Sequence, residues 1–238
     1  MRKHLLFITL IALLFNCKPD AVSPNAIAYN SGRLKAFNDK PIKFETIVIL
    51  GSSTASGVGA SQYKYSWAGL LRGNFFKGQV VNLAKGGYTT YHILPNNASH
   101  PGGRPSSDTL RNITAALARK PTTLIISMTT NDVASGVSID EIMSNLNLIR
   151  AKAIAAGVRQ VIITTSHPRK INASATAKYI QQRDRIMQTY GESAVNFFDP
   201  VADSEKCFKA ELLSGDNLHP NDKGHEILFE QIRKALKL

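Results

Sequence analysis

The sequence predicts an α/β protein in which helices cover both faces of one parallel sheet. Three observations support this fold class. Short apolar runs rich in β-branched residues alternate with segments of helical periodicity, nearly every run ends in a turn, and no repeat is visible. The runs lack the apolar–polar alternation of half-exposed strands, which is typical of strands buried on both faces. One domain accounts for a chain of 238 residues.

Each element follows from its local pattern. The five predicted strands cover residues 46–50, 79–83, 122–128, 160–165 and 194–198. The predicted helices cover residues 65–76, 107–119, 138–156, 173–190 and 222–236. Ser138 and Glu141 have the spacing of a capping box, Gly157 ends the helix that they begin, and Asn221 caps the last helix. Residues 88–107 contain three prolines and form a long surface loop.

Composition limits the classes of function. The formal net charge is +12, but the Lys and Arg residues are spread along the chain and form no recognisable nucleic-acid module. Nucleic-acid binding is therefore not expected, and attraction to an anionic surface is the milder interpretation. With only two cysteines, Cys17 and Cys207, metal binding through a cysteine cluster is excluded.

The N-terminus has the form of an export signal. Arg2 and Lys3 precede an apolar run, residues 5–15, which is too short to span a bilayer, and Cys17 follows. This pattern resembles a bacterial lipoprotein signal in which Cys17 is lipidated; the alternative is a plain signal peptide with an incidental cysteine. We expect a signal peptide over 1–16, a tether over 17–43 and a folded domain over 44–238. Lipidation of Cys17 would leave no partner for a disulfide.

Candidate catalytic residues lie just past the carboxyl ends of predicted strands. Ser53, Gly87 and Asn131 follow the first, second and third strands, and such ends share one edge of a parallel sheet. Asp216 and His219 lie three residues apart before the last helix, so the aspartate can orient the imidazole toward a serine hydroxyl. Taken alone, Ser53 is an ordinary turn residue. Together these residues have the logic of a Ser-His-Asp triad.

Four blocks in this order resemble the SGNH hydrolases, also called GDSL-type esterases and lipases. They are GSSTASG at 51–57, NLAKGG at 82–87, TTND at 129–132 and DNLHP at 216–220. The resemblance covers the domain from about residue 44 to the end. It implies the fold of that family, a three-layer α/β/α sandwich with a flavodoxin-like five-stranded parallel sheet.

The resemblance also implies roles for individual residues. Ser53 is the nucleophile, His219 the general base and Asp216 the third triad member. The oxyanion is held by the backbone N–H groups of Ser53 and Gly87 and by the side-chain amide of Asn131, while Asp132 is structural. No cofactor and no metal are expected.

Three positions depart from the family pattern. Ser52 stands where the family has the aspartate of Gly-Asp-Ser, Thr129 replaces a glycine, and Ala84 follows Leu83 where Asn-x-Gly is common. None of these changes removes a catalytic group. Ser52 is the change most able to alter the setting of the nucleophile.

Other residues compete for the same roles. The rival bases are His92, His100, His167 and His225, of which His167 is the most credible because it follows the fourth strand. In the long loop, Tyr88, Tyr91, His100 and Arg104 either contact the substrate or are simply solvated.

The sequence thus predicts a serine esterase in the bacterial cell envelope, tethered to the membrane by a lipid. The substrate is expected to be a small ester or an acylated carbohydrate, and a tethered location favours deacetylation of carbohydrate. A non-catalytic glycan-binding protein and an acyltransferase remain alternatives on this scaffold, because fold alone does not determine function. The oligomeric state is left open.

Overall fold

A computed structural model describes residues 44–128 and 130–238. The predicted signal peptide, Cys17 and the tether lie outside the described residues, as does Thr129. Residues 42–238 form one compact unit.

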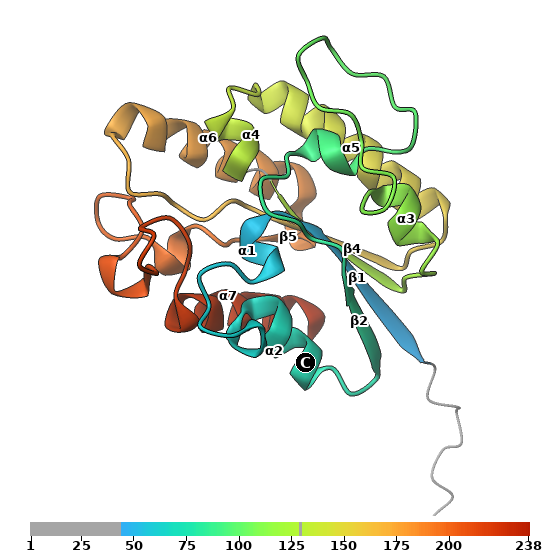
Figure 1. The fold of residues 1–238 in the computed structure, drawn as a ribbon, viewed down its shortest axis with the longest axis horizontal. Coiled ribbons are helices and arrows are strands. Elements are labelled where there is room, and N and C mark those ends of the chain that lie inside the picture. Colours follow the sequence, from blue (N-terminus) through green and yellow to red (C-terminus); the bar gives the residue numbers. More distant parts are fainter. Residues whose placement is uncertain (1–43, 129) are drawn as a thin grey trace, which may run out of the picture. The chain divides into compact units, whose positions relative to one another are not determined.

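The strands form a single five-stranded sheet (Figure 1). They are β1 (Glu45–Gly51), β2 (Gly78–Asn82), β3 (Thr123–Ser127), β4 (Gln160–Thr164) and β5 (Ala194–Val195). Their order is β2-β1-β3-β4-β5, and every neighbouring pair is parallel. This is the flavodoxin-like order, so the predicted fold class is confirmed.

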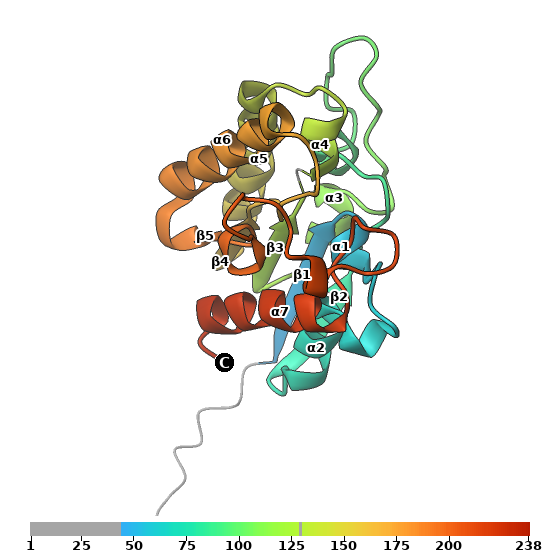
Figure 2. The same cartoon turned by 90° about the vertical axis from the view of Figure 1, so that its left-hand side faces the viewer.

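Helices cover both faces of the sheet (Figures 1 and 2). They are α1 (Ser53–Ser56), α2 (Trp67–Asn74), α3 (Ile113–Leu117), α4 (Thr130–Ala134), α5 (Ile139–Ala155), α6 (Ala173–Tyr190) and α7 (Asp222–Leu236). Single turns of 3-10 helix are η1 (Tyr63–Tyr65), η2 (Thr90–Ile93), η3 (Gly191–Ser193), η4 (Asp199–Val201) and η5 (Ala210–Leu212). Within the described ranges, no helix is both long and apolar enough to cross a membrane.

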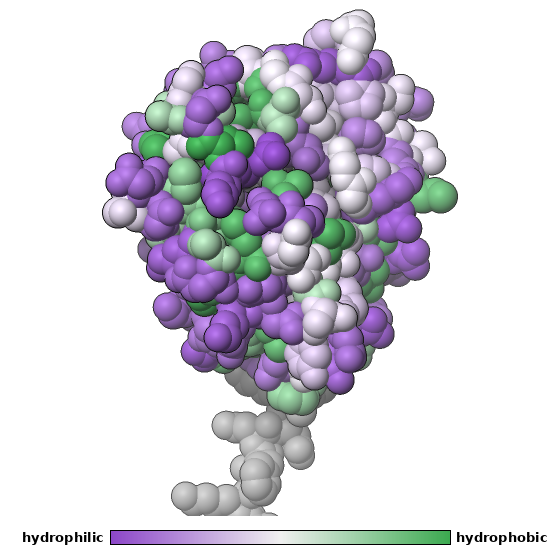
Figure 3. All heavy atoms as spheres, turned by 60° about the vertical axis from the view of Figure 1, so that its left-hand side comes forward, coloured by the Kyte–Doolittle hydropathy of each residue, from purple (hydrophilic) through white to green (hydrophobic). Residues whose placement is uncertain are grey.

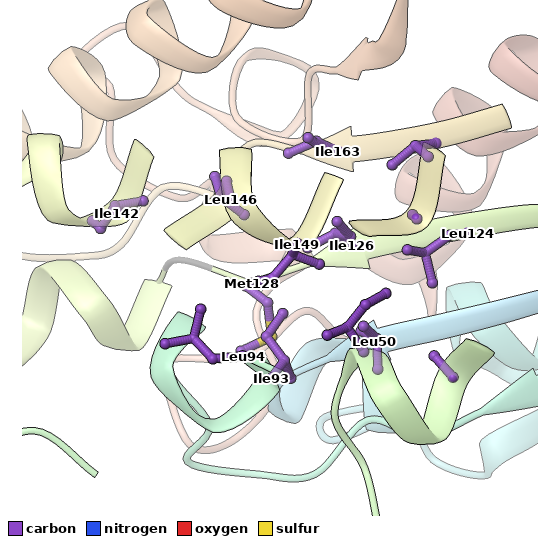
Figure 4. Close-up of a cluster of buried hydrophobic side chains, with 14 of the residues drawn as sticks. Leu50, Ile93, Leu94, Leu124, Ile126, Met128, Ile142, Leu146, Ile149 and Ile163 are labelled. Atoms are coloured by element: carbon purple, nitrogen blue, oxygen red, sulfur yellow. The ribbon is translucent and has the colours of Figure 1, made fainter. Parts of the chain in front are cut away.

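Successive side chains of a strand point to opposite faces of the sheet, so alternate strand residues belong to two separate hydrophobic cores. Val48 and Leu50 of β1 belong to the core under α3, α5 and α6, which also contains the labelled α5 residues of Figure 4: Ile142, Leu146 and Ile149. Ile47 and Ile49 belong to the core that holds buried residues of α2 and α7. Among the described residues, both cores draw on residues from Ile47 onward.

Two predicted elements are shorter than expected. The strand predicted over 194–198 pairs only through Val195, since Asn196 then accepts the backbone N–H groups of Phe198 and Asp199 and turns the chain away from the sheet. The helix predicted from residue 107 begins only at Ile113, where Asn112 caps it. Leu110, which lies within the predicted helix but before the observed one, is 78% exposed.

Local chemistry explains the correct boundaries. Ser138 and Glu141 form the predicted capping box, and Asn221 caps α7 by accepting the N–H of Gly224. The short helices α1 and α4, which directly follow β1 and β3, were not predicted because four or five residues carry no readable period. On the face drawn in Figure 3, hydrophobic side chains occur as small patches between hydrophilic ones.

Candidate active site

Ser53 begins α1 directly past the carboxyl end of β1. The turn between strand and helix is very tight. A Cβ at Gly51 would lie 2.3 Å from the Cβ of Ala55, so only glycine fits at the last position of β1. α1 ends at Gly57, whose φ of 95° lies in the left-handed region. These two glycines hold the serine at the edge of the sheet where its neighbours β2 and β3 also end.

A continuous hydrogen-bonded chain joins Ser53, His219 and Asp216. His219 Nε2 lies 2.7 Å from Ser53 Oγ, and His219 Nδ1 lies 2.6 Å from Asp216 Oδ2. Such distances are those of strong hydrogen bonds in a triad, in which the nucleophile contacts a base that a third group orients. The fold therefore brings together the serine, histidine and aspartate that the sequence singled out, from opposite ends of the domain.

Two backbone N–H groups and one hydroxyl hold the Asp216 carboxylate in place by donating hydrogen bonds to it. Its Oδ1 accepts the N–H groups of Leu218 and His219 at 2.9 Å each, and the hydroxyl of Ser214 at 2.7 Å. Burial raises the pKa of this carboxyl, but the donors, with His219 first among them, outweigh burial and hold its pKa well below the usual range. Asp216 is therefore ionised near neutral pH, and its negative charge stabilises a positively charged ring.

The loop before η1 supports the histidine from the other side. Gly59 has a φ of 95°, and a Cβ there would lie 2.7 Å from the Cβ of His219 and 2.3 Å from the carbonyl oxygen of Pro220. Ser61 fixes this loop by donating its N–H and its hydroxyl to the Asp222 carboxylate at 2.7 and 2.6 Å. Contact between loop and histidine thus depends on the missing side chain of Gly59.

The turn after β2 approaches the nucleophile. A Cβ on Gly86 would lie 3.9 Å from the Cβ of Ser53, and Gly87 has a φ of 81° with open space where its side chain would be. Asn131, in α4, donates its amide to the backbone carbonyl of Tyr88 at 2.9 Å. The Asn131 amide has a second N–H, for which the described residues provide no acceptor. The structure therefore ties Asn131 to the chain directly after Gly87.

Asp132 makes the structural contacts that the sequence predicted for it. It is completely buried, and its carboxylate accepts both the N–H and the hydroxyl of Thr90. The hydroxyl of Thr90 in turn accepts the amide of Asn145 in α5. This network holds η2, α4 and α5 together behind the Gly87 turn.

His167 is not an alternative base. It is 3% exposed, its Nδ1 donates to the carbonyl of Pro168 at 2.8 Å, and its Nε2 accepts the hydroxyl of Thr54 at 3.0 Å. The carbonyl oxygen can only accept, which fixes the proton on Nδ1 of a neutral ring. Burial, with a smaller effect from the nearby His219, lowers the pKa of His167 to about 4.

The other rival histidines are engaged elsewhere. His225 is fully buried, accepts the N–H of Trp67 at 3.3 Å and lies 3.1 Å from the carbonyl of Val58, and burial lowers its pKa to about 4. His92 stacks on the ring of Tyr88, with ring centroids 4.5 Å apart. His100 lies 3.3 Å from the hydroxyl of Ser106. Among the described contacts, only His219 reaches Ser53.

Three residues of the long loop serve its own structure. Tyr88 donates its hydroxyl to Asp108, and Tyr91, only 3% exposed, donates to Glu141 at 2.8 Å. Arg104 pairs with the same Glu141 at 2.9 Å. For Tyr91, the two roles proposed from the sequence, substrate contact and simple solvation, are therefore both wrong, because the side chain is buried and bonded.

Sequence reasoning missed several residues that shape the site. Thr54 and His167 support the nucleophile from behind, Ser214 donates to Asp216, and Gly59 contacts His219. None carries a motif of its own, because serine, threonine and glycine are common in turns. No group of three or more His, Cys, Asp or Glu residues close enough to hold a metal ion occurs in the part of the chain that the structure describes.

An open cavity of about 510 Å³ lies beside the Asp216 end of the chain of hydrogen bonds. Its lining includes the polar residues Ser61, Glu211, Ser214 and Lys223 together with Leu213. Gly59, which contacts His219, lines it as well. The triad thus has a neighbouring surface that offers hydroxyl, carboxylate and ammonium groups.

Comparison with known proteins agrees with this geometry. Residues 49–227 match the model of the GDSL-like lipase/acylhydrolase family. A GDSL lipase of Mycobacterium tuberculosis is 26% identical over 99 residues, which are 42% of this chain and 41% of that lipase.

Two solved structures share the fold. The psychrotrophic esterase EstA from Pseudoalteromonas sp. has a TM-score of 0.59 at 22% identity, covering 81% of this chain and 97% of that one. A two-domain esterase active on acetylated mannans has a TM-score of 0.55 at 18% identity, covering 81% of this chain and 49% of that one. The family match spans most of the chain and includes Ser53, Gly87, Asn131 and His219. The chain therefore belongs to the GDSL-like lipase/acylhydrolase family, the SGNH hydrolases, which makes it a carboxylic ester hydrolase.

Proposed function

We propose that this protein is a serine esterase that hydrolyses its substrate through an acyl-enzyme formed on Ser53. The observation that carries the proposal is the uninterrupted hydrogen-bonded chain from Ser53 through His219 to Asp216, at 2.7 and 2.6 Å. Asp216 holds the ring so that Nε2 is free to accept the serine proton.

In the first half of the reaction, Ser53 Oγ attacks the ester carbonyl carbon while His219 Nε2 takes its proton. The negative charge on the carbonyl oxygen is held by the N–H groups of Ser53 and Gly87 and by the second amide N–H of Asn131. Each such donor is worth about 3 kcal/mol in a transition state. The tetrahedral intermediate then breaks its bond to the alcohol oxygen, and His219 gives the proton to the departing alcohol.

In the second half, water attacks the acyl-enzyme and His219 takes the proton of that water. Collapse of the second intermediate breaks the bond to Ser53 Oγ, which recovers its proton from His219. The products are a carboxylic acid and an alcohol, and the enzyme returns to its starting state.

For the substrate, we favour an acetylated carbohydrate. The open cavity beside Asp216 is lined by Ser61, Glu211, Ser214 and Lys223, groups that hydrogen-bond hydroxyls better than they accept a hydrocarbon chain. The structural neighbour active on acetylated mannans is compatible with this choice. An acyltransferase would use the same acyl-enzyme with a sugar hydroxyl in place of water. A glycan-binding protein without catalysis would not need the aligned triad.

We also propose that Cys17 carries a lipid that tethers the enzyme in the bacterial cell envelope. The support is the basic start, the apolar run over 5–15 and the cysteine that follows it. Labelled fatty acid incorporated by the native chain and lost in Cys17→Ser tests this assignment. Labelling that persists in Cys17→Ser contradicts it.

The decisive experiment follows hydrolysis of a short-chain aryl ester by the wild type and by Ser53→Ala. We expect Ser53→Ala to lose all but a trace of the rate while keeping the wild-type thermal unfolding midpoint. Equal rates for the two proteins would overturn the esterase proposal. A panel of acetylated sugars and long-chain acyl esters then tests the substrate: faster turnover of the long-chain esters would overturn the carbohydrate proposal alone.

A further inference from the structure

The amino ends of four strands form a continuous edge opposite the active site. The N–H of Glu45 donates to the carbonyl of Lys77 at 3.1 Å, and the N–H of Thr122 donates to that of Thr46 at 2.8 Å. Arg159 reaches the next strand by donating its N–H to Thr122 at 3.1 Å. The starts of β2, β1, β3 and β4 therefore lie side by side.

Two phenylalanines stand exposed on this edge. Phe44, directly before β1, is 63% exposed, and Phe76, just before β2, is 90% exposed. β1 and β2 are neighbouring strands, and their first residues, Glu45 and Gly78, are in register. The two phenylalanines therefore lie at the starts of adjacent strands. Phe75, the neighbour of Phe76, is only 6% exposed and packs into the hydrophobic core. The ring of Phe76 therefore contributes nothing to that core.

Exposed cationic side chains occur along the same edge as the two phenylalanines. The exposed cations at the starts of strands and at the end of α7 are Lys77, Arg119, Lys120, Arg159, Lys234 and Lys237. The end of α7 belongs to this edge because Gln160, at the start of β4, donates its amide to the carbonyl of Ala235 at 3.3 Å. Figures 1 and 2 both place the C-terminus at the end of the domain where β1 begins. We call these cations and the two phenylalanines the basic edge.

Carboxylates are scarce on the basic edge and concentrated on the opposite one. Glu45 is paired with Arg159 at 3.3 Å, and Glu192 precedes β5 at the far side of the sheet. By contrast, the segment between β5 and α7, which carries the triad aspartate, contains Asp199, Asp203, Glu205, Glu211 and Asp216. The active-site edge thus carries carboxylates together with cations such as Lys206, Lys209 and Lys223, whereas few carboxylates accompany the cations at the starts of the strands.

Exposed aromatic rings on the same edge as several lysines and arginines have the chemistry of an interfacial membrane contact. The rings enter the boundary between headgroups and acyl chains, while the cations bind anionic headgroups. A partner protein of matching acidity would satisfy the charges equally. We favour a membrane over a partner protein because of where the N-terminal segment is attached. The 43 residues before Phe44, which contain the apolar run and Cys17, join the domain at this edge.

We propose that the basic edge rests on an anionic phospholipid bilayer. β1, seven residues long, then separates the bilayer surface from Ser53 by about 20 Å, at roughly 3.3 Å for each residue. The active site faces away from the membrane, toward esters in the surrounding aqueous space. This inference concerns the surface of the domain and holds whether or not the esterase assignment is correct.

The test uses the chain from Lys18 onward, which lacks the apolar run and Cys17 but keeps the complete compact unit. Its sedimentation with vesicles of phosphatidylglycerol and phosphatidylethanolamine is compared with that on phosphatidylcholine vesicles. We expect binding to the anionic vesicles only, weakened as salt rises from 0.05 to about 0.5 M because added ions screen the attraction.

The variant that removes the contact is Phe76→Ser with Lys77→Gln. We expect at least fivefold weaker partitioning, since each cation near an anionic surface contributes roughly a factor of five. The matched control changes the same kinds of residue at the other edge, Leu110→Ser with Lys170→Gln. Leu110 is 78% exposed and Lys170 is exposed after β4, so both proteins keep their interiors. Equal thermal unfolding midpoints verify this.

Three outcomes would overturn the proposal. The wild type binds no anionic vesicle, or it binds neutral vesicles as tightly, or the control loses as much binding as the variant. Duplex DNA provides a further arm: binding to DNA as tight as that to vesicles, and lost in the same variant, would reassign the basic edge to polyanions in general.

Discussion

Thr54, the residue after the candidate nucleophile, donates its hydroxyl to Nε2 of the buried His167 over 3.0 Å. His167 is in turn fixed by its bond to the carbonyl of Pro168. α1 is only four residues long, so this side-chain bond is a main restraint on the direction in which Ser53 points. Thr54 and His167 thus help to position Ser53 and do not themselves contact the reacting atoms.

Thr54→Val should therefore lower kcat with little change in KM. The valine keeps the shape but leaves Nε2 of His167 buried without a partner, which costs about 1–3 kcal/mol of folding free energy. We expect kcat for an aryl ester to fall by roughly tenfold, because a small misplacement of a nucleophile has a large kinetic effect. Thr54→Ser, which restores the hydroxyl, should recover most of the rate. A variant that loses stability with no change in kcat would limit the pair to a structural role.

Asn131→Ala tests the proposed oxyanion contact. Its loss should reduce kcat by roughly 10²–10³ while KM stays near the wild-type value, as expected for a donor that bonds only the transition state. Because Asn131 also donates to Tyr88, the amide serves the loop as well as the reaction. Asn145→Ala, which removes the buried amide that donates to the hydroxyl of Thr90, is the control and should cost stability with less effect on kcat. Equal losses of kcat in the two variants would contradict the oxyanion role.

Gly59→Ala should displace the histidine. The new Cβ would lie 2.3 Å from the Pro220 carbonyl oxygen, and the φ of 95° adds strain for any residue with a side chain. We expect a loss of at least tenfold in kcat and about 1–3 kcal/mol in the free energy of unfolding. Gly103→Ala has similar strain, at a φ of 81°, with nothing within 4 Å of its new Cβ, so it separates strain from the clash. If both alanines behave alike, the contact with His219 is irrelevant.

Stability should decline as the pH falls from about 6.5 toward 4. Burial lowers the pKa of His167 and of His225 to about 4 in the folded protein. In the unfolded chain the two histidines have their ordinary pKa near 6.5, so between pH 6.5 and 4 the unfolded chain binds protons that the folded protein does not bind. The stabilisation is complete above pH 6.5 and is lost through the window down to pH 4. Each histidine accounts for up to about 3 kcal/mol.

Denaturant unfolding between pH 7 and 4.5 measures this decline. His225→Gln should flatten the slope of the free energy of unfolding against pH by about half, although it lowers the stability at pH 7. The carboxylates with lowered pKa values, such as Asp216, contribute mainly below this window. An unchanged slope in His225→Gln would show that another group dominates.

The sequence was most informative where chemistry and periodicity coincide. The parallel sheet follows from buried runs that alternate with helical segments, while its flavodoxin-like order was implied by the family resemblance. Ser53 follows from its place at a strand end, and Asp216 and His219 from their spacing before the last helix. α7 was predicted over its full length because Asn221 marks its start.

The remainder depended on contacts between distant residues. His167 looked like a rival base, since nothing local reveals that Thr54, 113 residues earlier, bonds to it. Gly59 looked like any turn glycine, because only the folded chain places its missing side chain against His219. β5 ended early because Asn196 bonds the backbone after it, which competes with strand pairing at a position where composition favoured a strand.

Ser53 and His219 are 166 positions apart in the sequence, and this separation has a consequence for the biosynthesis of the enzyme. A ribosome delivers the serine long before the histidine, and α7 follows the histidine along the chain. No truncated or partly synthesised chain that lacks α7 can hold the base against the nucleophile. Ester hydrolysis by the proposed triad therefore begins only once His219 has been made and has docked against Ser53.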